Sequence, residues 1–176
     1  MTRQLSKVSV IFLWICSAFI NTAHAQHYKV YLDSAKRFKV SIPETWTYIP
    51  NYKETFFLAH RPVRYKGESK IENLALSKIE DTSAKSLEEA FNFLLITNKS
   101  NDSTMQVSEQ GTSKKGNYRW YISTHRNSKT SEIIKSMAMV YFFKNHPYIL
   151  QCTASTLSFD KHKDIFVKIA DSIQFM

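Results

Sequence analysis

The chain contains very little glycine, and this shortage excludes one large class of proteins. Only Gly67, Gly111 and Gly116 occur among 176 residues, and they are not clustered. Phosphate-binding loops and dinucleotide-binding motifs need closely spaced glycines, because their backbone N–H groups must approach the phosphates. We therefore expect no nucleotide-binding function and no cofactor.

The linear motifs of hydrolases and metal enzymes are also missing. The sequence has no G-x-S-x-G motif. Its histidines after residue 25 are far apart, and none belongs to an H-E-x-x-H motif: His27, His60, His125, His146 and His162. We therefore expect no metal site and interpret the protein as noncatalytic. The alternative is a small envelope hydrolase whose site assembles from scattered His, Asp and Ser residues.

Residues 1–25 have the pattern of a cleavable secretory signal peptide. Arg3 and Lys7 precede the apolar run VIFLWIC at 10–16, and AHA at 23–25 supplies small residues at both positions of an A-x-A cleavage site. The apolar run is too short for a good membrane-spanning helix. The pattern predicts a secreted or periplasmic protein without a transmembrane segment after cleavage, and an uncleaved N-terminal anchor is the competing interpretation.

Removal of the signal would leave a basic chain with one cysteine. Residues 26–176 have the length of one domain with one sizeable core. They hold 22 basic and 15 acidic residues, a formal charge of +7, which favours anionic partners. Cys152 has no second cysteine with which to form an internal disulfide. It shares a predicted strand face with apolar residues, and this favours a buried thiol over a reactive one.

The apolar pattern predicts a domain of antiparallel strands and two helices. Alternating residues indicate strands at 28–33, 38–42, 55–60, 71–79, 104–110, 117–125, 132–144 and, after a tight turn at 145–147, 148–155. Ser86 with Glu89 forms a capping box before one helix, and Ser158 precedes a second. The order lacks the regular alternation of a parallel α/β fold. We expect an α+β domain with an antiparallel sheet of about six to eight strands flanked by two main helices.

Several segments together resemble the PsbP-like domains, which include bacterial exported DcrB-like proteins. They are FKVSIPETW at 38–46, the helix after Ser86, the long run of strands, and YILQCTAS at 148–155 followed by FVKIADSIQF. The resemblance spans nearly all of residues 26–176 and implies a noncatalytic binding or assembly module. No motif allows the functional residues of PsbP to be assigned here. Pro43 is expected to end a strand, and Trp46 to pack over the core.

The loop HRPVRYKGESK at 60–70 is the candidate binding site. It holds Arg61, Arg64, Tyr65, Lys66 and Lys70, which together can bind an anionic surface through charge and stacking. An exported protein is expected to meet an envelope protein, an anionic glycan or a lipid headgroup, and nucleic acid is disfavoured. The alternative is a solvated basic loop, because charged residues gather at surfaces in most proteins.

Overall fold

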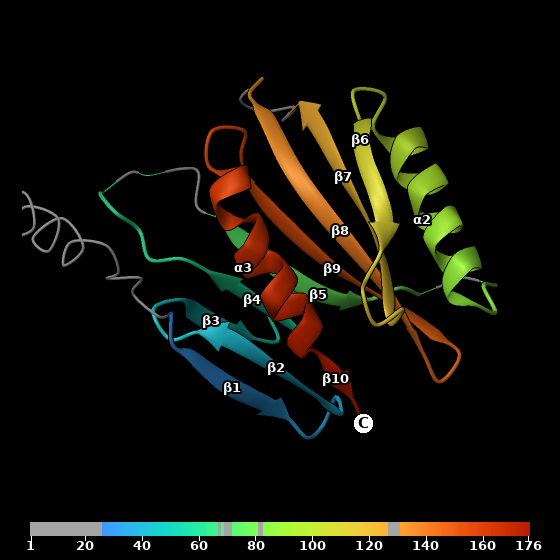
Figure 1. Ribbon diagram of the computed structural model, residues 1–176, viewed down its shortest axis with the longest axis horizontal. Helices are drawn as coiled ribbons and strands as arrows, with labels where there is room; N and C mark the ends of the chain where they lie inside the picture. Colours follow the sequence, from blue (N-terminus) through green and yellow to red (C-terminus); the bar gives the residue numbers. More distant parts are fainter. Residues whose placement is uncertain (1–25, 67, 69–71, 81–82, 127–130) are drawn as a thin grey trace, which may run out of the picture.

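A seven-stranded antiparallel sheet forms the centre of the computed structural model, which describes residues 26–66, 68, 72–80, 83–126 and 131–176 (Figure 1). Its strands, from one edge to the other, are β3 (Thr47–Pro50), β4 (Phe57–His60), β5 (Asn73–Lys78), β9 (His146–Ser155), β8 (Ile133–Phe143), β7 (Tyr118–Arg126) and β6 (Gln106–Thr112). A separate three-stranded sheet contains β1 (Tyr28–Asp33), β2 (Phe38–Pro43) and β10 (Gln174–Phe175). The predicted signal peptide lies outside the described residues.

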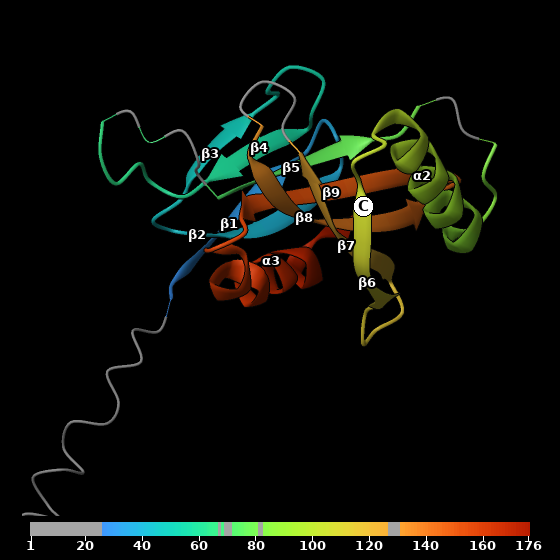
Figure 2. The ribbon, with the colours of Figure 1, turned by 90° about the horizontal axis from the view of Figure 1, so that it is seen from above.

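Two helices lie on opposite faces of the large sheet (Figure 2). Helix α3 (Phe159–Ser172) and the small sheet pack on one face, and the main core lies between them and the large sheet. Helix α2 (Leu87–Asn101) packs on the other face over β7 and β8. The predicted α+β class and both predicted helices are therefore confirmed. None of the described helices is long and apolar enough to cross a membrane.

Side chains alternate between the two faces of each strand, and every second residue of the central strands points into the main core. Leu74 of β5, Cys152 of β9, Met137 of β8 and Ile122 of β7 are cross-strand neighbours, and each is at most 1% exposed. Cross-strand neighbours point to the same face, so this apolar row crosses four strands under the small sheet and α3. Burial of this apolar face stabilises the packing of the small sheet and α3 on the large sheet.

The turn between β8 and β9 differs from the prediction. Lys144 and Asn145 have φ angles of 49° and 62°, which are the left-handed values of a two-residue type I′ hairpin turn. Strand β9 already begins at His146, so the predicted turn at 145–147 is one to two residues too late. Pro147 is accommodated near the first position of the strand, where a missing N–H is tolerated.

The helix starts also differ from the predicted pattern in detail. The Ser86 hydroxyl accepts a hydrogen bond from the backbone N–H of Glu89 at 3.2 Å, as expected for a capping box. The Glu89 carboxylate, however, accepts from the N–H of Lys85 at 2.8 Å instead of from that of Ser86. At the start of α3, Ser158 makes no side-chain cap bond. Its hydroxyl lies 2.8 Å from that of Ser155.

The segment FKVSIPETW has the structural role that its pattern predicts. Pro43 is the last residue of β2, which forms the expected hairpin with β1. Trp46 is 6% exposed and packs edge-on against Phe166 of α3. Strands β3 and β10 were not predicted. The two residues of β10 show no periodicity, and the four residues of β3 include Pro50, which argues against a strand.

Burial makes the Cys152 thiol unreactive in the folded protein. Its side chain is fully buried, and burial raises its pKa well above the ordinary value for cysteine. A thiol reacts as the thiolate, so we expect a maleimide to label Cys152 only after denaturation. A matched control is Gln151→Cys in a Cys152→Ala background, which places the thiol one residue away on the exposed face. Fast labelling of Cys152 in the native protein would contradict its burial.

Candidate functional site

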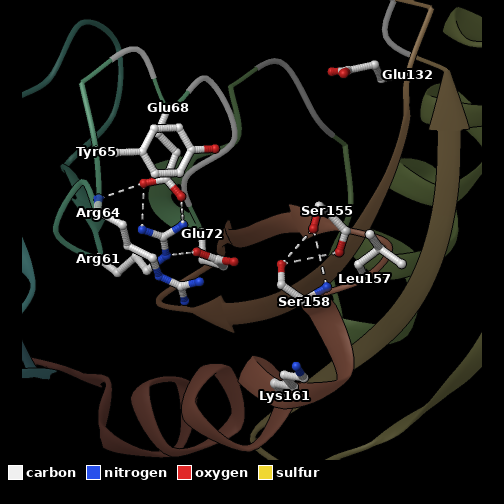
Figure 3. A pocket seen from close by; sticks show the side chains of 10 residues that line it. All are labelled: Arg61, Arg64, Tyr65, Glu68, Glu72, Glu132, Ser155, Leu157, Ser158 and Lys161. Carbon is white, nitrogen blue, oxygen red and sulfur yellow. Dashed lines mark hydrogen bonds and ion pairs between the residues drawn. The ribbon is translucent and has the colours of Figure 1, made fainter.

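A pocket of about 480 Å³ lies where the 61–72 loop meets the end of β9 and the start of α3 (Figure 3). The loop contributes Arg61, Arg64, Tyr65, Glu68 and Glu72, and the opposite wall contains Ser155, Leu157, Ser158 and Lys161. Loop and helix are brought together because β5, which follows the loop, pairs with β9, which precedes the helix. The pocket contains most of the predicted binding residues.

Arg61 lies inside the loop and is only 6% exposed. Its guanidinium forms ion pairs with both Glu68 and Glu72, as Figure 3 shows. Nη1 also donates to the carbonyl of Pro62 at 2.7 Å. Arginine suits this position because its planar fork of donors can bind carboxylates on two sides. Arg61 therefore joins the start, the middle and the end of the loop.

The two carboxylates are held in their ionised forms. The Arg61 side chain, followed by the backbone N–H of Arg64 at 2.7 Å, lowers the pKa of Glu68 to about 2. Burial by itself would raise the pKa of Glu72. Hydrogen bonds from the Ser158 hydroxyl, the backbone and Arg61 outweigh burial, so the pKa of Glu72 is lowered. Both groups are anions at neutral pH.

Three other predicted binding residues lie at the surface of the loop. Arg64 and Lys66 are exposed, and Tyr65 is 66% exposed. Lys70 lies outside the described residues. Leu157 is 89% exposed on the opposite side of the pocket. The loop therefore turns one arginine inward and presents a cationic and aromatic surface outward.

The pocket is concave and contains titratable groups, as a hydrolase site would. The hydrogen bonds of its serines and of the nearby histidine do not form a catalytic arrangement. The Nδ1 atom of His162 lies 2.9 Å from the backbone carbonyl of Ser158, to which it must donate. The Ser158 hydroxyl contacts Ser155 and Glu72 instead of an imidazole. Within the described ranges, no serine hydroxyl of the pocket is hydrogen-bonded to a histidine. The ionised Glu68 and Glu72 are also poor general acids at neutral pH.

The charge partners of Arg61 were missed by the sequence analysis. Glu68 and Glu72 follow it by seven and eleven residues. The segment was predicted as a loop, and in a loop the spacing along the sequence does not indicate which side chains meet. The only available signal was the presence of two acidic residues in a mainly basic loop.

Among the residues that the structure describes, no group of three or more His, Cys, Asp or Glu side chains could hold a metal ion.

The buried ion pair predicts a stability effect for Arg61→Met. The substitution leaves Glu72, which is 2% exposed, without its cationic partner. Loss of one partner of a buried pair is costly, so we expect the free energy of unfolding to fall by about 3 kcal/mol in denaturant titrations. The control Arg64→Met, at an exposed position, should change it by less than about 0.5 kcal/mol. Equal effects of the two substitutions would contradict the internal role of Arg61.

The lowered pKa of Glu68 predicts a contribution to acid stability. Its value of about 2 lies below the ordinary 4.5, so the folded state binds this proton less readily than the unfolded state. Its contribution is complete above pH 4.5 and is lost as the pH falls from 4.5 toward 2. Glu68→Gln should therefore show a shallower fall of the thermal midpoint over this range. Glu80→Gln, in a surface pair with Lys78, should follow the unsubstituted protein.

Comparisons with known proteins identify structural relatives. No protein-family model and no curated protein matches the sequence. Cyanobacterial PsbP (CyanoP) from Synechocystis sp. PCC 6803 superimposes with a TM-score of 0.55 at 15% identity, over 89% of this chain and 96% of that one. The Saccharomyces cerevisiae Ran-binding protein Mog1p gives a TM-score of 0.61 at 9% identity, over 86% and 96%.

A third similar structure comes from Mycobacterium tuberculosis. It is LpqN, described as involved in cell envelope biogenesis, with a TM-score of 0.51 at 14% identity over 88% of this chain and 87% of that one. Identities this low establish the fold and leave the activity open. The chain has the PsbP-like α+β fold that the sequence predicted.

Proposed function

We propose that the protein is an exported, noncatalytic binding or assembly module that recognises the acidic surface of a protein partner through its 61–72 loop. The observation that supports this proposal is the inward position of Arg61. The Arg61 guanidinium pairs with Glu68 and Glu72 inside the loop and holds its backbone in place. Arg64, Tyr65 and Lys66 remain at the surface. A loop that is ordered before binding loses less conformational entropy on binding.

The residue types around the pocket fit a protein partner. Tyr65 and Leu157 are exposed apolar groups, and Arg64, Lys66 and Lys161 supply positive charge beside them. Tyrosine and arginine are the residue types enriched at the energetic centres of protein interfaces. The formal charge of +7 on residues 26–176 would also steer an acidic partner toward the protein. Lys70 belongs to the same loop, and we include it in the proposed contact surface.

The proposed export and binding role agree with the comparisons. The signal-like residues 1–25 support secretion or a periplasmic location. LpqN, with the same fold, is described as involved in cell envelope biogenesis, and Mog1p is described as a Ran-binding protein. The fold therefore occurs in a protein that binds another protein. An anionic glycan or a lipid headgroup would use the same positive charges.

The test is capture of envelope proteins by the immobilised mature chain, residues 26–176. We expect Arg64→Glu/Lys66→Glu to reduce capture of a specific protein at least tenfold, because like charges would face the acidic partner. Higher salt should weaken the capture by the unsubstituted protein. The matched control is Lys114→Glu/Lys115→Glu, which makes the same charge change in the β6–β7 loop at the opposite edge of the sheet.

Each other outcome has a defined meaning. Equal capture by the two double variants would refute the 61–72 loop as the contact surface. Retention of anionic vesicles or of an acidic polysaccharide, with no protein captured, would refute the protein partner. Thermal unfolding of every variant verifies that lost capture does not arise from lost folding.

A further inference from the structure

A continuous row of polar side chains crosses the large sheet on the face opposite α3. The cross-strand partners are Thr47 with His60, His60 with Asn73, Asn73 with Thr153, Thr153 with Ser136, and Ser136 with Ser123. Directly opposed residues point to the same face, so the six side chains form one row across six strands. Strands lie about 4.8 Å apart, which makes the row about 24 Å long. We call it the polar row.

In the neighbouring row of the same face, the middle side chain, Gln151, is exposed to solvent. Gln151 lies on β9, which is hydrogen-bonded to strands on both sides, yet it is exposed. Its two cross-strand neighbours are Ala75 and Ala138, whose side chains are too short to cover it. Helix α2 packs over Tyr121, Ala138 and Val140 and therefore covers only the β7–β8 side of this face.

A hollow lies at the end of the polar row, where the C-terminal end of α2 approaches the sheet. Its volume is about 190 Å³, and Ser123, Ser136 and Gln151 of the sheet line it together with Asn98 and Asn101 of α2. Asp102 and His125 also line it. The volume is smaller than the roughly 300–1,000 Å³ of pockets for drug-sized ligands. The hollow suits one small polar unit. The rest of a longer molecule would lie along the half-buried Thr153, Asn73 and His60 toward the exposed Thr47.

The Ser136 hydroxyl is an independent indication of a ligand. Ser136 is 4% exposed, and its Oγ has no hydrogen-bond partner among the described residues. Nearly all buried polar groups are hydrogen-bonded, and an unsatisfied one is destabilising. A partner supplied from the hollow would satisfy this hydroxyl.

The charge of this surface defines the class of the ligand. None of the six residues of the polar row is Lys, Arg, Asp or Glu, although the protein has 24 basic and 15 acidic residues. Among the described residues that line the hollow, Asp102 is the one acidic residue, and its carboxylate can accept hydrogen bonds from sugar hydroxyls. Hydroxyl and amide groups both donate and accept hydrogen bonds, as the hydroxyls of a sugar do. We propose that the polar row and the hollow form a binding site for a neutral glycan chain, with one sugar unit in the hollow. This site is separate from the proposed contact surface of the 61–72 loop.

The test is isothermal titration of the full chain with three neutral tetrasaccharides: cellotetraose, maltotetraose and chitotetraose. At least one should bind, with an affinity that changes little between about 50 and 500 mM salt, because the ligand carries no charge. Thr153→Val and Ser136→Ala should each weaken binding about two- to tenfold through a lost hydrogen bond. The control Thr112→Val, at an exposed position of β6, should bind as the unsubstituted protein does.

Stability measurements separate a lost ligand contact from lost folding. Valine suits a strand, and alanine removes a hydroxyl that has no partner, so neither substitution should lower the thermal midpoint. Arg64→Glu/Lys66→Glu should retain tetrasaccharide binding, which makes this test independent of the proposed protein partner. The proposal is overturned if none of the three sugars binds at millimolar concentration, or if Thr153→Val and Ser136→Ala bind as tightly as Thr112→Val.

Discussion

The pairing of β5 with β9 holds the two parts of the large sheet together. It joins strands about 75 residues apart, with Leu74 opposite Cys152 and Leu76 opposite Leu150, and all four side chains are fully buried. Without this ladder the β3–β4–β5 strands and the β6–β9 strands would be two separate sheets (Figure 1). Because such a contact closes a long loop, its entropic cost must be offset by the apolar surface that it buries.

The same ladder creates both proposed binding surfaces. Beyond one end of the ladder, the 61–72 loop and the start of α3 are brought together, so that Glu72 reaches Ser158. Within the ladder, Asn73 is placed opposite Thr153 and continues the polar row into the C-terminal strands. The two surfaces differ in charge because they use different parts of the chain. The loop surface carries Arg64 and Lys66, whereas none of the six residues of the polar row is Lys, Arg, Asp or Glu.

Arg61 illustrates why net charge is an incomplete guide to a binding surface. The loop sequence is basic, but two carboxylates neutralise its first arginine within the fold. The remaining exposed residues, Arg64, Tyr65 and Lys66, are presented on a backbone that this internal cluster holds in place. The cationic surface therefore lacks one of the arginines that the loop sequence suggests. By contrast, the polar row has no sequence motif, because its members come from six separate strands.

Local sequence patterns were sufficient to predict the fold class, most strands, both helices and the burial of Trp46 and Cys152. These features depend on local periodicity, capping residues and the alternation of apolar side chains, all of which lie within short windows of sequence. Tertiary structure alone decided the charge partners of Arg61 and the alignment of Ser136 with Thr153. These depend on strand register and on contacts between distant residues, and a one-residue change of register would turn every such side chain to the other face.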